Sequence, residues 1–229
     1  GIPMVPDELT EVAFYGREDV AALLDEGKVP LGLDLETVEP VTWDLKKGNL
    51  LCLTDKEEQM TQFVKQIARS KQKVIVLAPA YNELPEMEGV TILSTKEAYV
   101  AGIKKMEENI QLRLEQQKSQ HEATIVLYNQ LELMNDLSMD LQSSLNYVLE
   151  KGARAGYATV AMSGSQLNRK IDEVSKSIKL YKQAIVAMRI TDQSVLNVIN
   201  RPVREEPLDS QVNYYVEDGF VRKVKVLMK

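Results

Sequence analysis

The 229-residue sequence has very little of the residue types on which several common functions depend. Its one cysteine, Cys52, lies in an apolar run, so there is no disulfide framework. Its one histidine, His121, lies in a polar stretch far along the chain, and these two side chains alone cannot form a zinc site. No apolar run approaches the roughly 18 residues of a membrane span, and no signal-peptide pattern opens the chain. No metal and no direct membrane contact are therefore expected.

Basic residues are also too few and too scattered for a nucleic-acid-binding protein. The formal net charge is −6, and Lys and Arg never occur more than two in a row. Binding to the phosphate backbone normally needs a basic face, so no nucleic-acid partner is expected. The 44% apolar content suffices to bury one substantial core. We therefore expect a single domain over residues 1–229, in which residues 1–47 form N-terminal helices and edge strands packed on the core.

Apolar runs typical of buried strands alternate with segments of helical periodicity from about residue 50 to residue 200. Alternation of this kind predicts an α/β fold with a doubly wound, mostly parallel sheet. Near the N-terminus, Pro30 lacks an N–H group, which predicts an edge strand over residues 29–34. Near the C-terminus, Asp218-Gly219 between two alternating runs predicts a β-hairpin. The predicted strands cover 50–53, 73–78, 90–93, 123–128, 157–162 and 184–190, and the predicted helices start near 55 and cover 95–118, 130–151 and 168–180.

The stretch from Gly48 to Ser70 reads as a strand, a turn and a helix, which is where nucleotide-binding α/β proteins place their phosphate loop. A working loop, G-x-x-x-x-G-K-[ST], supplies glycine N–H groups, a lysine and a hydroxyl for Mg²⁺. In this register, Thr54 and Gln59 stand at the glycines and Met60 at the lysine, and only Thr61 is retained. Either the loop has lost its chemistry or the stretch was always an ordinary turn, and the stretch itself favours neither.

The same turn has a second pattern that satisfies the helix start without a phosphate. Thr54 and Glu57 have the spacing of a capping box, in which the two side chains accept hydrogen bonds from backbone N–H groups at the start of the helix. Asp55 and Glu58 add further carboxylates where a triphosphate would lie. Met60 and Phe63 either line the vacated pocket or, as their helical spacing indicates, belong to the core.

Two further loops would complete a nucleotide site. P-loop hydrolases end a neighbouring strand in an Asp that holds Mg²⁺, often with a catalytic Glu. Here the strand runs into Tyr128 and Asn129, and neither is a carboxylate. Asn129 can alternatively be a helix N-cap. The loop at 163–166, where a phosphate sensor would lie, has small polar residues that also form turns. Hydrolysis is therefore not expected, and ATP and Mg²⁺ binding is doubtful.

Several motifs, in this order and spacing, make the chain resemble the FtsK/SpoIIIE-type ATPase modules. More closely, it is similar to the C-terminal (third, degenerate) module of the membrane-bound coupling proteins of type VII secretion in Firmicutes. The likeness covers essentially the whole chain. The motifs are Ile2-Pro-Met-Val-Pro6, Val29-Pro-Leu-Gly-Leu-Asp34, Val38-Glu-Pro-Val-Thr-Trp-Asp-Leu45, Gly152-Ala-Arg-Ala-Gly156, Arg189-Ile-Thr-Asp-Gln-Ser194 and the closing Tyr215-x-x-Asp-Gly-x-Val-x-Lys-Val pattern.

The resemblance implies a RecA-like P-loop NTPase fold and a non-hydrolysing function. It implies that the module recognises small helical WXG-type secreted proteins, regulates the neighbouring active module, or does both. The implied partners are these proteins and the preceding ATPase modules, at the cytoplasmic side of the cell membrane. Arg154 matches the Arg of the family's Gly-Arg-x-x-Gly stretch, which implies a contact in trans with an adjacent module's nucleotide. A helix C-terminal Arg that interacts with the helix dipole is the alternative.

Two other functions stay open. Thr61 and Lys56 could retain weak, non-hydrolytic ATP binding, or the chain could be a purely structural assembly domain. Substrate recognition would require an exposed apolar groove beside the long helices or the open strand ends.

Overall fold

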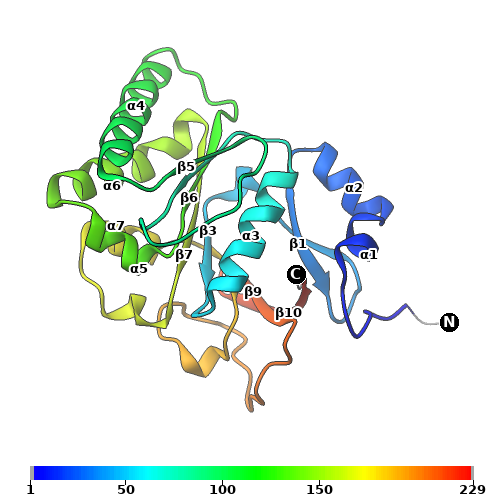
Figure 1. The fold of residues 1–229 in the computed structure, drawn as a ribbon. Coiled ribbons are helices and arrows are strands. Elements are labelled where there is room, and N and C mark those ends of the chain that lie inside the picture. Colours follow the sequence, from blue (N-terminus) through cyan, green and yellow to red (C-terminus); the bar gives the residue numbers. More distant parts are fainter. Residues whose placement is uncertain (1–2, 228–229) are drawn as a thin grey trace.

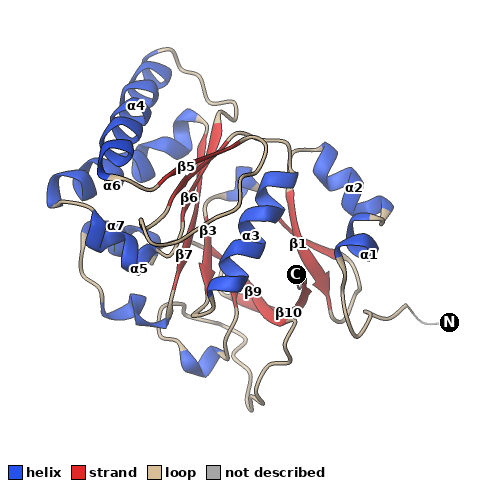
Figure 2. Ribbon diagram, in the orientation of Figure 1, coloured by secondary structure: helices blue, strands red, loops and turns tan. Residues whose placement is uncertain are grey.

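The computed structural model describes residues 3–227, so Ile2 of the first motif lies outside the described part. The fold is built on one ten-stranded sheet with helices on both faces (Figures 1 and 2). The strand order is β2-β1-β10-β9-β8-β3-β7-β6-β4-β5. The strands are β1 (Val29–Asp34), β2 (Pro40–Trp43), β3 (Leu50–Leu53), β4 (Val74–Leu77), β5 (Val90–Leu93), β6 (Ala123–Leu127), β7 (Tyr157–Ser163), β8 (Gln183–Val186), β9 (Val212–Glu217) and β10 (Phe220–Val226).

The sheet has a parallel half and an antiparallel half. From β8 to β5 every pairing is parallel, as the alternation of strands and helices predicts. From β2 to β8 every pairing is antiparallel, because the C-terminal hairpin β9–β10 inserts between β1 and β8. The predicted hairpin and mostly parallel sheet are thus confirmed. The hairpin is an internal part of the sheet that joins its two halves.

Helices cover the sheet unequally. The helix α3 (Glu57–Arg69) packs on one face, against a core that includes Leu50 and Cys52 of β3. The helices α4, α6 and α7 pack on the other face, against Leu51 and Leu53 of the same strand. This alternation places successive residues of a strand on opposite faces. The remaining bounds are α1 (Glu11–Tyr15), α2 (Glu18–Asp25), α4 (Lys96–Glu115), α5 (Gln130–Leu133), α6 (Met139–Gly152) and α7 (Glu173–Ile178), with 3-10 turns at Leu45–Lys47, Met134–Asp136, Ala153–Ala155, Ser165–Arg169 and Ile190–Asp192.

The prediction of an edge strand at Pro30 is wrong. The strand β1 pairs with β2 on one side and β10 on the other, and β2 forms the edge. A register shift between Pro30 and Gly32 accommodates the residue that lacks an N–H group. The amide of Gln66 on α3 donates to the carbonyls of Pro30 (3.3 Å) and Leu31 (3.2 Å), so this irregular stretch is also bonded to the helix that covers it.

Two predicted helices are shorter or broken. The segment 130–151 is interrupted, because Ser138 starts a new helix by accepting a hydrogen bond from the Leu141 N–H. The segment 168–180 is α-helical only over α7, which Asp172 caps, and residues 168 and 169 belong to the preceding 3-10 turn. Trp43 of β2 is fully buried in the α3-side core and donates from Nε1 to the Gly48 carbonyl at 2.9 Å.

Candidate functional site

The carboxyl ends of three neighbouring parallel strands bring the three predicted loops together. Thr54 follows β3, Ser163 ends β7 and Tyr128 follows β6, and these strands are adjacent in the order β3-β7-β6. Ligands of open α/β sheets bind at this edge. The backbone N–H of Thr54 donates to the Ser163 carbonyl at 2.9 Å, so the first and third loops are directly linked.

The predicted capping box at Thr54 and Glu57 is wrong. Thr54 is buried, and its hydroxyl accepts a hydrogen bond from the Lys56 N–H at 3.0 Å, which closes a tight turn before the helix. The helix α3 starts at Glu57, and its N-cap residue, Lys56, makes no side-chain capping bond. Thr54 therefore lies too far before the helix to cap it.

The Glu57 carboxylate makes long-range contacts at the start of α3. Its Oε1 accepts a short hydrogen bond from the Asn82 amide and lies 3.4 Å from the Tyr128 hydroxyl. That hydroxyl also lies 2.9 Å from the Thr61 hydroxyl, which donates to the Glu57 carbonyl at 3.2 Å. We call Glu57, Thr61, Asn82 and Tyr128 the start-of-α3 cluster. It fastens the loops after β4 and β6 to the first turn of α3.

Tyr128 is a neutral partner in this cluster. Burial raises the pKa of its phenol, the Thr61 hydroxyl opposes that shift, and the Glu57 carboxylate adds to it. The phenol therefore stays protonated at neutral pH and can donate to Glu57. A neutral phenol cannot hold Mg²⁺ as the Asp of an active site does.

The other positions of the phosphate-loop register also lack phosphate-binding chemistry. Met60, at the lysine position, is 5% exposed and packs with Phe63 in the α3-side core, so neither side chain lines an open pocket. The Gln59 amide oxygen accepts from the Asn213 amide of β9 at 3.4 Å. Glu57 and Glu58 place two carboxylates in the first helical turn, where N–H groups and the helix dipole would otherwise attract an anion. This set of donors does not match that of a Mg²⁺–nucleotide site.

Asn129 has an unusual conformation that positions its side chain across the second loop. It occupies the N-cap position of α5 with φ 50°, but its side chain does not cap the helix. The amide instead donates to the Asn82 side-chain oxygen at 3.0 Å and the Tyr81 hydroxyl at 3.2 Å. Asn82 and Tyr81 were missed by sequence reasoning, because only their neighbours in the fold distinguish them from other residues of a polar loop.

The third loop is bonded to the first through Asp55. The Asp55 carboxylate accepts from the Ser165 N–H at 2.9 Å. A Cβ at Gly164 would lie 2.6 Å from the Asp55 Oδ1 atom, so only glycine leaves that oxygen in place. Behind it, Gln130 accepts from the Ser163 hydroxyl at 2.8 Å and donates to the Ser175 hydroxyl at 2.9 Å. All three loops are thus joined to one another without a ligand.

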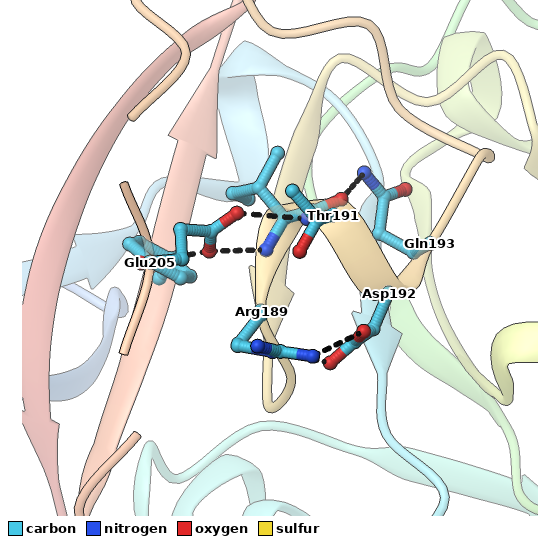
Figure 3. A network of polar contacts seen from close by, with 7 residues as sticks. Arg189, Thr191, Asp192, Gln193 and Glu205 are labelled. Atoms are coloured by element: carbon cyan, nitrogen blue, oxygen red, sulfur yellow. Dashed lines mark hydrogen bonds and ion pairs between the residues drawn. The ribbon is translucent and has the colours of Figure 1, made fainter. Parts of the chain in front are cut away.

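A polar cavity of about 350 Å³ lies beside this edge, between Lys56 and Gln59 of the first loop and the segment after β8. Figure 3 shows the network on that segment. Arg189 makes a two-pronged ion pair with Asp192, with distances of 2.9 and 3.0 Å. The Glu205 carboxylate accepts from the N–H groups of Ile190 (2.7 Å) and Thr191 (2.8 Å). The Arg189 charge is thus compensated within its own motif.

Arg154 lies at the opposite ends of the parallel strands from the three loops. It belongs to the turn Ala153–Ala155 immediately before β7, at the amino ends of the parallel strands, and is exposed. The buried Arg113 holds this turn by donating to the carbonyl of Ala155 at 2.7 Å. The Arg113 guanidinium also donates to the Gln120 carbonyl and pairs with Glu122 at 3.1 Å. Arg154 is therefore presented outward by a fixed turn and cannot reach the loop at Thr54–Thr61 of its own chain.

Within residues 3–227, no three or more His, Cys, Asp or Glu side chains are grouped so as to hold a metal ion. None of the helices described above is long and apolar enough to cross a membrane.

The architecture is that of a RecA-like P-loop ATPase fold, which confirms the predicted fold class. No family model matches the sequence. The sequence is 25% identical to the type VII secretion system protein EssC of Staphylococcus aureus (strain MRSA252), over 99% of this chain but 16% of EssC. This confirms the resemblance carried by the motifs, and it is consistent with a C-terminal ATPase module of EssC.

Solved structures support the same relationship at the level of fold. EssC (ATPases 2 and 3) from Geobacillus thermodenitrificans superposes with a TM-score of 0.87 at 19% identity, covering 99% of this chain and 45% of that one. EccC (ATPases 2 and 3) of Thermomonospora curvata, solved in complex with a signal sequence peptide, gives 0.74 at 15% identity, covering 99% and 44%. The chain thus spans less than half of these two-module structures.

Proposed function

We propose that this chain is a non-hydrolysing, ATPase-like module of a type VII secretion motor. In this proposal it recognises secreted substrates, regulates the neighbouring active module, or does both, and it does not bind Mg²⁺–ATP. The observation that carries the proposal is the Glu57 carboxylate, which lies at the start of α3 between the Asn82 amide and the Tyr128 hydroxyl.

Electrostatics at this edge support the loss of nucleotide binding. Asp55, Glu57 and Glu58 contribute three carboxylates within four residues, against the single charge of Lys56. Each would repel a triphosphate, and the lysine that would attract its β and γ oxygens is replaced by the buried Met60. The three loops are also joined to one another, so a nucleotide would have to break these contacts on entry.

The proposed partners follow from the relatives. The EccC module pair binds a signal sequence peptide, and we extend that role to this chain with small helical WXG-type secreted proteins as the substrates. The preceding ATPase modules of the same protein are the second proposed partner, at the cytoplasmic side of the cell membrane. Arg154, fixed at the edge opposite the first loop, is the residue proposed to contact an adjacent module.

Two measurements on the purified chain test the proposal. Thermal unfolding with millimolar Mg²⁺–ATP should show no shift, whereas a ligand at about 100 times its Kd would stabilise the fold by roughly 2.7 kcal/mol. An active preceding module of the same motor is the positive control. Calorimetry with the C-terminal signal segment of a secreted WXG protein should show saturable binding.

The outcomes separate the candidate functions. A rise in unfolding temperature with Mg²⁺–ATP would replace the proposal with a residual nucleotide binder. Failure of every tested substrate segment to bind would remove substrate recognition and favour the structural assembly domain.

A further inference from the structure

The loops after four neighbouring parallel strands are joined by hydrogen bonds into a closed cycle. These strands, β3, β7, β6 and β4, are consecutive in the sheet, and their carboxyl ends lie at the same edge. In the first half of the cycle, the Asn82 amide after β4 donates to the Glu57 carboxylate. The Asn82 side-chain oxygen accepts from the Asn129 amide after β6 at 3.0 Å. The start of α3 is thus linked through the loop after β4 to the loop after β6.

The second half of the cycle returns to the first loop. Gln130, at the start of α5, accepts from the Ser163 hydroxyl at the end of β7 at 2.8 Å. The Ser163 carbonyl accepts from the Thr54 N–H at 2.9 Å, and Thr54 leads into α3. Beside it, the Asp55 carboxylate accepts from the Ser165 N–H at 2.9 Å. We call the residues of this cycle the edge network, namely Thr54, Glu57, Asn82, Asn129, Gln130 and Ser163.

The Glu57 carboxylate sets the direction of the bonds in the first half of the cycle. A carboxylate only accepts hydrogen bonds, so Asn82 must turn its NH₂ group toward it. The Asn82 oxygen then faces Asn129, whose own NH₂ group donates to it. Asn129 has a left-handed φ of 50°, and this side-chain bond helps to hold that conformation. Loss of the carboxylate would leave Asn82 free to turn over, and the link to Asn129 would be lost with it.

Burial makes the edge network sensitive to a break. The exposed fractions are 7% for Asn82, 1% for Thr54 and Ser163, and 0% for Gln130. A buried polar group without a partner is costly, and neighbouring hydrogen bonds strengthen one another where water is excluded. Glu57, in contrast, is exposed, so its substitution opens the cycle without leaving a cavity in the core.

We propose that the edge network is an internal substitute for a bound nucleotide and holds the loops at this edge in one arrangement. In working NTPases the γ-phosphate orders such loops, and they relax after hydrolysis. Here the Glu57 carboxylate takes over this linking role as a permanent anion supplied by the chain. The proposal rests on the proposed function and specifies its regulation: this edge presents the same surface to a neighbouring module in every nucleotide state of the motor.

Native-state amide exchange, measured by NMR on the whole chain, tests the proposal because it reports local opening residue by residue. Glu57→Ala removes the acceptor and opens the cycle. Glu57→Gln retains a side-chain oxygen that can accept from Asn82. Glu58→Ala is the matched control, since Glu58 is exposed in the same helical turn and is not part of the edge network. Exchange at Ile125 in the centre of β6 reports global unfolding in every variant.

The decisive amides are those of Thr54 and Ser165, because neither donates to the Glu57 carboxylate. Glu57→Ala should speed exchange at both about five- to tenfold, beyond any change at Ile125, because the opened cycle frees the loop after β7. Glu57→Gln and Glu58→Ala should each change these rates less than about twofold. Mg²⁺–ATP should change no rate in the unaltered chain.

Two results would overturn the proposal, and a third would remove the proposed function instead. Equal exchange in Glu57→Ala and Glu58→Ala would show that the edge network does not hold the loops. Faster exchange confined to the loop at Asn82, with Thr54 and Ser165 unchanged, would show that Glu57 makes only a local contact. Slower exchange at this edge with Mg²⁺–ATP in the unaltered chain would show that a nucleotide binds, whatever the variants do.

Discussion

The hydroxyl oxygens of Tyr128 and Thr61 lie 2.9 Å apart, although the residues are 67 positions apart in the sequence. In the phosphate-loop register, Thr61 is the one retained hydroxyl, and Tyr128 stands where a hydrolase has its Mg²⁺-holding carboxylate. The two side chains at the positions where a hydrolase has its Mg²⁺ ligands are thus bonded to each other.

Tyr128→Phe should destabilise the fold by about 0.5–1.5 kcal/mol, because it removes one buried hydroxyl that bonds Thr61 and Glu57. Urea unfolding measures the effect. Tyr81→Phe is the matched control, since Tyr81 is 64% exposed and its hydroxyl bonds only the Asn129 amide within residues 3–227. A cost at position 81 equal to that at position 128 would contradict a structural role for the start-of-α3 cluster.

Gly164→Ala should cost about 1 kcal/mol, because its Cβ would displace the Asp55 carboxylate from the Ser165 N–H. The cost should shrink when Asp55 is already alanine. A double-mutant cycle of Asp55→Ala with Gly164→Ala gives this coupling. Additive effects would show that the two loops are not joined in this way.

The two arginines near the turn before β7 should behave in opposite ways. Arg113→Met should destabilise the chain by about 2–3 kcal/mol, because two carbonyl groups lose a charged donor. Arg154→Met should change stability by less than about 0.5 kcal/mol, because the side chain is exposed. Thermal unfolding of both variants provides the comparison.

Arg154→Met should, however, alter the ATPase rate of an adjoining active module in the assembled motor. Arg154→Lys tests whether charge alone suffices. An unchanged rate in both variants would leave Arg154 with no role beyond its favourable position at a helix end.

Alkaline pH should destabilise the fold through its buried tyrosines. Burial, with a smaller effect of the Asp136 carboxylate, raises the pKa of Tyr99 from 10.0 to about 12. Between these values the phenol is ionised in the unfolded chain and neutral in the folded one, so the stabilisation is complete below pH 10 and is lost as the pH rises to 12. Urea unfolding across this range should show the decline. Tyr99→Phe should lower stability at neutral pH, because the bond to the Ala78 carbonyl is lost, and should make the alkaline decline shallower. An unchanged slope would contradict this origin.

Local patterns predicted the fold because each helix and strand is specified largely by its own residues. Thr95 caps α4 as its position before an amphipathic run indicates, and the continuously apolar β4 and β6 lie inside the parallel half of the sheet. Pro30 misled the prediction, because the register shift and the Gln66 amide that accommodate it come from a strand and a helix elsewhere in the chain.

The candidate site was predicted by position and missed in detail. The order of the strands brought Thr54, Tyr128 and Ser163 to one edge, as expected. The partners of Glu57 could not be predicted, because Asn82 and Tyr128 lie 25 and 71 residues away, and no local pattern specifies which polar side chain reaches it. Thr54 and Glu57 have the spacing of a capping box, which is a rule about residues close in the sequence. The Thr54 N–H is instead bonded to the Ser163 carbonyl of β7, a partner that this rule does not take into account.

The insertion of β9–β10 between β1 and β8 has a consequence for the order in which the molecule assembles. The parallel half can form from residues that emerge early and in the middle of synthesis, but β1 has no neighbour other than β2 until β10 exists. The strands β1 and β2 must therefore wait for residues 220–226, and this closure over about 190 residues is a slow, non-local step. Until then β1 and β8 each present an open strand edge to other chains in the cell.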